Sequence, residues 1–538
     1  MRPSLTHFSL PLALSGGALA IFLACASSEP SGDTGEPSDA PPAPSATTTA
    51  TPPAPTAIGE ASAPSTPQTR YQEIHGVLHM HSPLSHDACD GQGLDDAGAS
   101  NPGCLADLRA APCKDKLDFI ALTDHPSYMM SFEPTRNVLY DAAAGDVLVK
   151  DGAGGVIGNT MTCADGHKVL WTYGYESNHT LPLAFKKHPT RTDGYDLTRA
   201  PGDVTSLVAD LHDAGAIVAL AHSEADDIDA PLIVSGGADA MEWYNPHGNF
   251  KTALGGDQIT GAAADVIPIF NKMGDFLQGS TSGAHPDLFY LLILPKWPQK
   301  GFDKWREVQR SRFVPGVLGS DVHQNVSVDP VCKGAVQQAL CAALLGGGKP
   351  SVLTQLIAGG QIIMADGRRF DAFERLLRWL HNRVFVKSLA PEDLQEGIAH
   401  GRSYGLFSVF GDPKGFIFDG TAAGKPVDMG DEVAGPVALR VQLPTAPAPI
   451  PSGAVFDAAM AAKAEVRATL YRTTASGTAP VTSATGLGKL VSPTVTEPGQ
   501  YHVEIWIKPK HFATLLGDQA TSADTEYMWL ITNPIRVK

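Results

Sequence analysis

Short apolar runs alternate with amphipathic segments over most of the chain between residues 71 and 411. Four of these runs cover residues 74–78, 117–122, 216–220 and 314–318. Runs of this length without strict alternation are typical of buried parallel strands. Amphipathic helical patterns lie between them, for example at 204–214. This alternation predicts an α/β fold in which right-handed crossovers join parallel strands.

The pattern changes towards the C-terminus. Three helices are expected, at residues 349–364, 370–386 and 391–400. From residue 412 to 538 the runs become short and rich in Val and Thr, with Gly and Pro turns between them. The runs with some alternation cover residues 438–443, 465–471, 500–507 and 527–537. Such a series predicts an antiparallel β-sandwich.

Length and charge limit the kind of protein this is. A chain of 538 residues is long enough for two folded domains and a tail. The formal net charge of −17 argues against broad binding to nucleic-acid backbones, which requires clustered Lys and Arg.

The N-terminus is typical of an export signal. Residues 10–24 form an apolar stretch too short to span a bilayer, and it ends in Ile-Phe-Leu-Ala-Cys at residues 21–25. This end resembles a bacterial lipoprotein signal, although Phe22 stands where Leu is usual, so secretion without a lipid stays open. Residues 26–69, rich in Pro, Ala, Ser and Thr, are expected to form an extended tether. The resemblance implies an exported lipoprotein at the outer membrane or cell surface, which contacts the membrane only through its anchor.

Six cysteines follow the predicted anchor residue Cys25: Cys89, Cys104, Cys113, Cys163, Cys332 and Cys341. An even number in an exported protein is compatible with disulfides, and reduced, buried thiols are the alternative. Cys332 and Cys341 are close enough in sequence to close a small loop. The first three cysteines share one Gly- and Asp-rich insertion, and their pairing is open.

Histidines and carboxylates follow the apolar runs. The four segments are His79-Met80-His81, Thr123-Asp124-His125, Ala221-His222-Ser223 and Asp321-Val322-His323. In α/β barrels, the end of a parallel strand is where the reacting groups lie. Because no Ser or Cys nucleophile motif accompanies these segments, we expect a polynuclear metal site. Imidazole with carboxylate suits Zn²⁺, Mn²⁺ or Fe²⁺ better than Mg²⁺ or Ca²⁺.

These motifs, in this order, resemble the PHP superfamily, the metal-dependent phosphoesterase domain shared by histidinol phosphatase and bacterial polymerases. The matching segments are His79-x-His81 with Ser85-His86-Asp87, residues 118–125, residues 171–176 ending in Glu176, Ala221-His222, residues 239–245 and residues 319–323. The resemblance implies an irregular (β/α)7 barrel over residues 70–411, followed by the β-sandwich over residues 412–538.

The resemblance also implies which side chains bind metal. One ion would use His79, His81, Glu176 and Asp321, a second would use Asp87, His125 and His323, and a third would share Glu176 and use His179 and His222. His86 is a rival of Asp87, and His188 is a rival of His179. Glu176, Asp321 and His323 are the implied catalytic positions, and two or three divalent transition metals are the implied cofactors.

Residues 364–370, 378–380 and 401–404, with 499–504 and 532–535, resemble a branch of PHP hydrolases that includes carbaryl-type ester and carbamate hydrolases. The expected function is a metal-dependent hydrolase, foremost a phosphoesterase, acting on a small phosphorylated or ester molecule. The alternative is hydrolysis of a carboxylic ester, carbamate or amide at the same site. A second alternative is a surface lipoprotein that binds a partner without catalysis.

Overall fold

The computed structural model describes residues 70–192, 194, 200–246, 248, 272–294, 299–328 and 350–538. The predicted signal and tether at residues 1–69, with Cys25, lie outside the described residues, as do Cys332 and Cys341. Within these ranges, no helix is both long and apolar enough to cross a bilayer.

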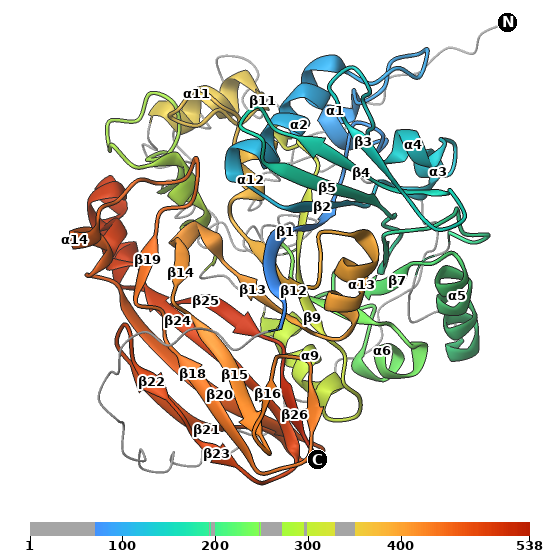
Figure 1. Cartoon of the computed structure of the whole chain (residues 1–538). Coiled ribbons are helices and arrows are strands. Elements are labelled where there is room, and N and C mark those ends of the chain that lie inside the picture. Colours follow the sequence, from blue (N-terminus) through green and yellow to red (C-terminus); the bar gives the residue numbers. More distant parts are fainter. Residues whose placement is uncertain are drawn as a thin grey trace, which may run out of the picture.

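Parallel pairing organises the central sheet (Figure 1). Hydrogen bonds join β5 to β2, β2 to β1, β1 to β9, β9 to β8 and β8 to β7. These strands are β1 (Gln72–Met80), β2 (Phe119–Leu122), β5 (Lys168–Tyr173), β7 (Ile217–Leu220), β8 (Ala240–Tyr244) and β9 (Gly316–Val322). Because the strands run the same way, the polar residues that follow them come to one edge of the sheet.

Next to β7 the sheet ends in an antiparallel strand. β6 (Thr180–Leu183) pairs antiparallel with β7. Just beyond β6, the backbone N–H of Phe185 donates to the carbonyl of Tyr173 at the end of β5, so the hydrogen-bonded path closes. The predicted α/β class is confirmed, whereas the PHP type of the barrel stays a prediction.

Helices lie around the outside of this sheet. They include α2 (Pro102–Asp115), α5 (Pro201–Asp213), α6 (Ala230–Gly236), α9 (Gln299–Gln309), α11 (Pro350–Ala358) and α13 (Pro391–Ala399). Of these, α2 and α6 begin at side-chain caps. The Asn101 side chain accepts from the backbone N–H groups of Gly103 and Cys104 at the start of α2. The predicted helix at 204–214 and the strand after it are confirmed as α5 and β7.

The predicted helix at residues 370–386 is wrong. Only Phe373–Leu377 is helical (α12), and His381–Val386 is a strand, β12, that pairs antiparallel with β1. Val384 and Val386 are buried in this strand. β-Branched residues suit a strand, and pairing with β1 satisfies the backbone, so tertiary contacts override the helical pattern.

The C-terminal strands continue this sheet. β13 (Ser403–Leu406) joins β12 to β25 (Tyr527–Thr532), and β24 (Gly499–Lys508), β20 (Glu465–Thr474) and β21 (Gly477–Thr485) follow in antiparallel order. A separate antiparallel sheet contains β15 (Ile417–Ala422), β16 (Lys425–Val427), β18 (Val437–Gln442), β22 (Leu490–Val491) and β23 (Thr494–Val495). Hydrogen bonds therefore join strands on either side of the predicted boundary at residue 411. The predicted domain boundaries and the sandwich stay predictions.

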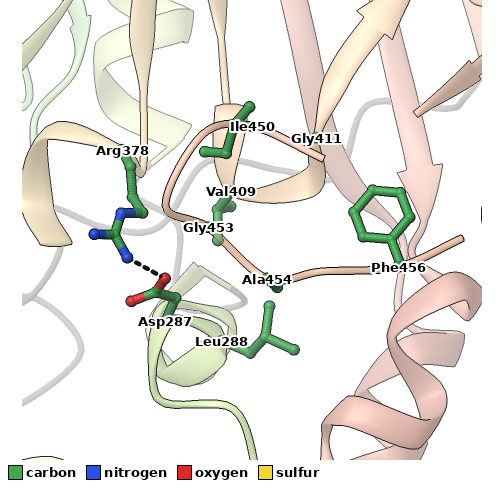
Figure 2. A pocket seen from close by; sticks show the side chains of 9 residues that line it. All are labelled: Asp287, Leu288, Arg378, Val409, Gly411, Ile450, Gly453, Ala454 and Phe456. Atoms are coloured by element: carbon green, nitrogen blue, oxygen red, sulfur yellow. Dashed lines mark hydrogen bonds and ion pairs between the residues drawn. The ribbon is translucent and has the colours of Figure 1, made fainter. Parts of the chain in front are cut away.

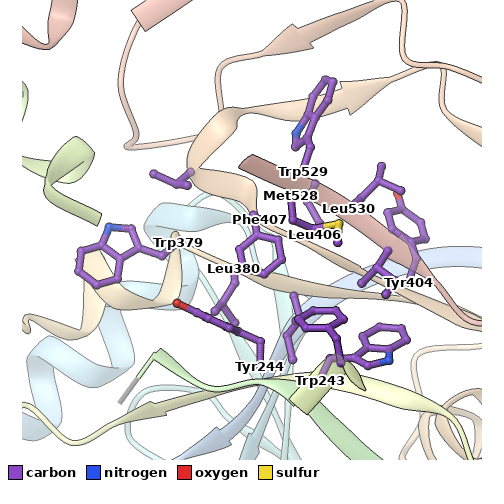
Figure 3. Close-up of a cluster of buried hydrophobic side chains, with 14 of the residues drawn as sticks. Trp243, Tyr244, Trp379, Leu380, Tyr404, Leu406, Phe407, Met528, Trp529 and Leu530 are labelled. Carbon is purple, nitrogen blue, oxygen red and sulfur yellow. The ribbon is translucent and has the colours of Figure 1, made fainter. Parts of the chain in front are cut away.

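Large aromatic side chains fill the region where β8, β13 and β25 meet (Figure 3). Trp243 packs edge-on against Trp305, with ring centroids 5.4 Å apart, and Tyr244 packs similarly against Phe407 at 5.3 Å. Trp529 is also fully buried. This packing holds β8, which carries Glu242, in a fixed place beside β9.

Two disulfides tie the insertion after β1 and the hairpin before β5 to the rest of the fold: Cys89–Cys104 and Cys113–Cys163. The two cysteines are 15 residues apart in sequence in the first disulfide and 50 residues apart in the second. The longer loop loses more chain entropy on closure.

We expect Cys113→Ser with Cys163→Ser to lower the free energy of unfolding by about 4 kcal/mol. Cys89→Ser with Cys104→Ser should lower it by about 3 kcal/mol. Urea unfolding of both double variants measures the two losses. A wild-type unfolding midpoint that is unchanged by a thiol reductant would contradict both expectations.

Candidate metal centre

Side chains from five strand ends and one loop converge at one edge of the central sheet. His79 belongs to β1 and His81 follows it, whereas Asp321 lies within β9 and His323 follows that strand. The other members of the cluster are Asp87 after β1, His125 after β2, Glu176 after β5 and His222 after β7. Six of these eight side chains have relative exposures of 7% or less, and His125 and His222 are half-buried.

Three of the strand ends carry left-handed backbone at a non-glycine residue. The φ angles are 59° at His79, 51° at His222 and 51° at Asp321. This conformation costs an L-residue about 1–2 kcal/mol. Such outliers concentrate at functional sites, where the surrounding structure holds them in place.

Each of the five imidazoles in the cluster has a protein oxygen beside its Nδ1 atom. The Nδ1 partners are Glu242 Oε1 for His79 (2.7 Å), Ser85 Oγ for His81 (3.2 Å), the Glu176 carbonyl for His125 (3.0 Å), Glu224 Oε1 for His222 (3.3 Å) and the Asp321 carbonyl for His323 (3.1 Å). A carboxylate or carbonyl at Nδ1 favours a proton there, which leaves the Nε2 lone pair available.

The Nε2 atoms of the same five rings all approach a carboxylate of the cluster. The distances are 3.4 Å from His79 to Asp321 Oδ1, 3.6 Å from His81 to Asp321 Oδ1, 3.3 Å from His125 to Asp87 Oδ2, 3.6 Å from His222 to Asp321 Oδ2 and 3.1 Å from His323 to Asp87 Oδ2. Two ligand atoms that each lie about 2.0–2.1 Å from one zinc ion are themselves about 3 Å apart. The spacing therefore fits shared cations.

Three overlapping groups have ligand atoms that all lie within 4.8 Å of one another. They are His81, Asp87, His125 and His323; His79, His222 and Asp321; and His79, His81 and Glu176. His79 and His81 each belong to two groups, so neighbouring ions would lie close together. The donor set, nitrogen with carboxylate oxygen, suits divalent transition metals.

Burial and neighbouring charges set the protonation of this cluster. Burial, with the nearby His323 and His125 rings, lowers the pKa of His81 well below its usual value. Burial also lowers the pKa of His125, but hydrogen bonding to Asp87 and the Glu176 charge outweigh it and raise that pKa to about 9. Burial would raise the pKa of Asp87, yet the His323 and His125 imidazoles lower it overall. A bound cation would take the place of the protons that these carboxylates attract.

The structure brings eight of the nine predicted ligands into these groups, and His179 is the exception. Its Nε2 bonds to Asp227 Oδ1 at 2.8 Å, and its Nδ1 lies 3.3 Å from the Ala221 carbonyl, so both ring nitrogens have partners. His222 groups with His79 and Asp321 instead of with His179. The role of His179 stays a prediction.

Neither rival histidine belongs to a group. The His86 ring centroid lies 4.8 Å from that of His125, whereas Asp87 Oδ2 directly faces His125 and His323. His188 Nε2 bonds to the Phe132 carbonyl at 3.0 Å.

Glu242, which is fully buried on β8, is not among the site residues predicted from the sequence. Its Oε1 accepts from His79 Nδ1, and its Oε2 accepts the backbone N–H of His222 at 2.8 Å. It therefore orients two candidate ligands from outside the cluster. The signal available in the sequence is a single carboxylate in the otherwise apolar strand Ala-Met-Glu-Trp-Tyr, because an unpaired buried charge is too costly to be incidental.

A different pocket contains a buried ion pair that does not concern metal binding. Arg378 Nη1 donates to Asp287 Oδ2 at 2.6 Å, beside Leu288 and Val409 (Figure 2). None of the residues that line this pocket is a candidate ligand. Arg375 donates to the other oxygen of Asp287, so this carboxylate is neutralised by two guanidinium groups and serves the packing of α12.

Comparisons with known proteins add little to this geometry. No protein-family model matches the chain, and no curated protein matches it in sequence. Among solved structures, the chain is similar to a two-domain protein from Bacteroides vulgatus that contains a predicted PHP-like metal-dependent phosphoesterase. The identity is 12%, the match covers 82% of this chain and 94% of the other, and the TM-score is 0.25.

Proposed function

We propose that this protein is a metal-dependent hydrolase of the PHP type whose preferred substrate is a small phosphoester. The observation that carries the proposal is the shared orientation of five imidazoles. Each is held at Nδ1 by a protein oxygen and presents Nε2 to Asp87 or Asp321. Such uniform orientation is expected of ligands to cations.

Two buried nitrogens support the fit of a metal directly. His79 Nε2 and His81 Nε2 are inaccessible to solvent and make no hydrogen bond within the described part of the chain. Both are more than 3.3 Å from the nearest Asp321 oxygen, at 3.4 and 3.6 Å. A buried polar atom without a partner costs about 1–3 kcal/mol, and a cation between these atoms removes that cost.

Some residues of the cluster would hold the ions, and Glu242 would orient a ligand. Asp87 and Asp321, with the five imidazoles, would hold two or three divalent ions, Zn²⁺, Mn²⁺ or Fe²⁺, and Glu176 would hold one through the group that contains His79 and His81. When bound, such ions act as Lewis acids and lower the pKa of water towards 7. Glu242 keeps the proton of His79 on Nδ1, so that Nε2 remains a ligand. Clustered positive charge also favours an anionic phosphoester over a neutral ester.

The proposal extends to the location of the protein. The N-terminal signal motif and the Pro/Ala/Ser/Thr-rich segment support export with a lipid anchor at Cys25. The two disulfides agree with an oxidising compartment. The enzyme would then act outside the cytoplasm while tethered to a membrane.

Hydrolysis assays on the purified protein test this function. The protein is stripped with a chelator, loaded with Mn²⁺ or Zn²⁺, and assayed on phosphomonoesters, phosphodiesters and carboxylic esters. We expect a phosphoester to be hydrolysed, with activity lost on stripping and restored by metal. Activity retained in the stripped protein would contradict the metal mechanism. Hydrolysis of carboxylic esters alone would overturn the assignment as a phosphoesterase.

A further inference from the structure

A pocket opens directly beside the candidate metal centre. Asp321 and His323 form one side of it, next to Ser320. Gln324, Asn325 and Asp371 also line it. The rest of the wall is apolar and consists of Pro246, Ile293, Val326, Phe370, Leu376 and Trp379. The space amounts to about 490 Å³, including its open mouth. A molecule whose reacting group lies at Asp321 and His323 therefore has an apolar hollow next to it.

The aromatic wall of this pocket is fixed by packing. Trp379 is 1% exposed and stacks on Tyr290, with ring centroids 4.5 Å apart. Phe370 lies 5.7 Å from Trp379 and packs edge-on against Phe289 at 4.9 Å. Rings held on their far side in this way lose little further entropy when a ligand binds, so the hollow is preformed.

Both oxygens of the carboxylate in the wall, Asp371, have hydrogen-bond partners within the protein. Asp371 accepts two hydrogen bonds from Arg369, at 2.5 and 2.9 Å, and one from the backbone N–H of Val326 at 2.6 Å. Arg369 is shared with Asp90, but both oxygens of Asp371 are hydrogen-bonded within the protein, so an apolar group in the pocket would not face an unpaired carboxylate. Apart from Asp371, Gln324 and Asn325, the wall away from the metal centre is apolar.

We propose that this pocket binds an aromatic or similarly bulky apolar substituent of the substrate while the ester group lies at the metal centre. This inference rests on the proposed hydrolase function and adds the class of substrate: an ester of an alcohol that carries an aromatic ring. Removing a phenyl ring from water is worth about 1.5–3 kcal/mol, which corresponds to a preference of about ten- to a hundredfold.

The test compares two esters whose leaving groups have the same chemistry, 3-phenylpropyl phosphate and propyl phosphate. We expect kcat/KM to be about ten- to a hundredfold higher for the phenyl ester with the metal-loaded protein. Calorimetry with 3-phenylpropylphosphonate and propylphosphonate measures the two binding affinities, and therefore the same preference, independently of turnover. The discriminating variant is Leu376→Asn, which places an amide of the same branched shape in the apolar wall. Val326→Phe, which fills the hollow, is a second and independent variant.

Both variants should reduce the preference to within about threefold and leave metal content unchanged. Leu389→Asn is the matched control, because Leu389 is also half-buried but packs against a different core cluster. Equal rates for both esters in the wild type would overturn the pocket proposal and leave the hydrolase standing. A binding preference without any turnover would overturn the hydrolase and leave the pocket standing. Equal or absent binding of the two phosphonates would overturn the pocket.

Discussion

Replacing Asp321 by asparagine should lower kcat/KM for the hydrolysed ester by at least about a thousandfold. The Asp321 carboxylate lies within 3.4–3.6 Å of nitrogens from His79, His81, His222 and His323. Asparagine keeps the shape and removes the charge, so several kcal/mol of metal binding and charge stabilisation are lost. Because Asp321 approaches rings from all three groups, metal content should fall together with the rate.

Asp118→Asn is the control for this variant. Asp118 is also a carboxylate with a histidine partner, since its Oδ2 lies 2.9 Å from His75 Nδ1, but it belongs to none of the metal groups. We expect the rate of this control to stay within about threefold of wild type, because its partners His75 and His167 lie outside the metal groups. Steady-state kinetics and elemental analysis of both variants make the comparison. Near-normal activity of Asp321→Asn would exclude Asp321 from the reaction centre.

Replacing Gly319 by alanine should abolish activity although the change touches no proposed ligand. Gly319 lies on β9 two residues before Asp321, and a Cβ atom there would overlap the carboxylate of Glu242. Glu242 holds His79 Nδ1 and the backbone N–H of His222, so its displacement would misplace two ligands at once. Loss of a partner outside the coordination shell costs about 10–100-fold in metal affinity, and a clash in a packed core adds about 1–3 kcal/mol.

Gly202→Ala in α5 is the matched glycine control, because a Cβ there meets no atom within 4 Å. It should leave metal affinity and activity unchanged. Glu242→Gln separates the two causes, since it weakens the contact with His79 without a clash and should reproduce the loss of metal affinity but not the loss of stability. Metal titration and thermal unfolding of the three variants are the measurements. If Gly319→Ala binds metal like the wild type, Glu242 does not orient the ligands.

Much of the site could be predicted because its residues follow strands in short, recognisable segments. His81, His125, His222 and His323 each lie one to three residues past the end of a buried strand, so the end of the strand places the ligand. The α/β class followed from the same runs. These features are local in the sequence, and parallel pairing alone brings them to one edge.

Other features depend on contacts that the sequence does not display. The pattern of residues 381–386 predicts the end of a helix, and only the pairing with β1 shows that they form the strand β12. His179 looks equivalent to His222, but Asp227, 48 residues further along, occupies its Nε2 atom. Glu242 is recognised as an orienting residue only when the pairing of β8 with β7 and β9 brings it to His79 and His222. In each case the deciding partner is remote in the chain.

Elemental analysis of the purified protein after loading with Zn²⁺ or Mn²⁺ and removal of excess ion tests the central claim most directly. The convergence of five imidazoles on Asp87 and Asp321 predicts two to three tightly bound ions per chain. The same measurement on a variant with both His81→Ala and His323→Ala should show at least one ion fewer, while circular dichroism shows an unchanged fold. A wild-type content well below one ion per chain, or the same content in the double variant, would contradict the metal centre.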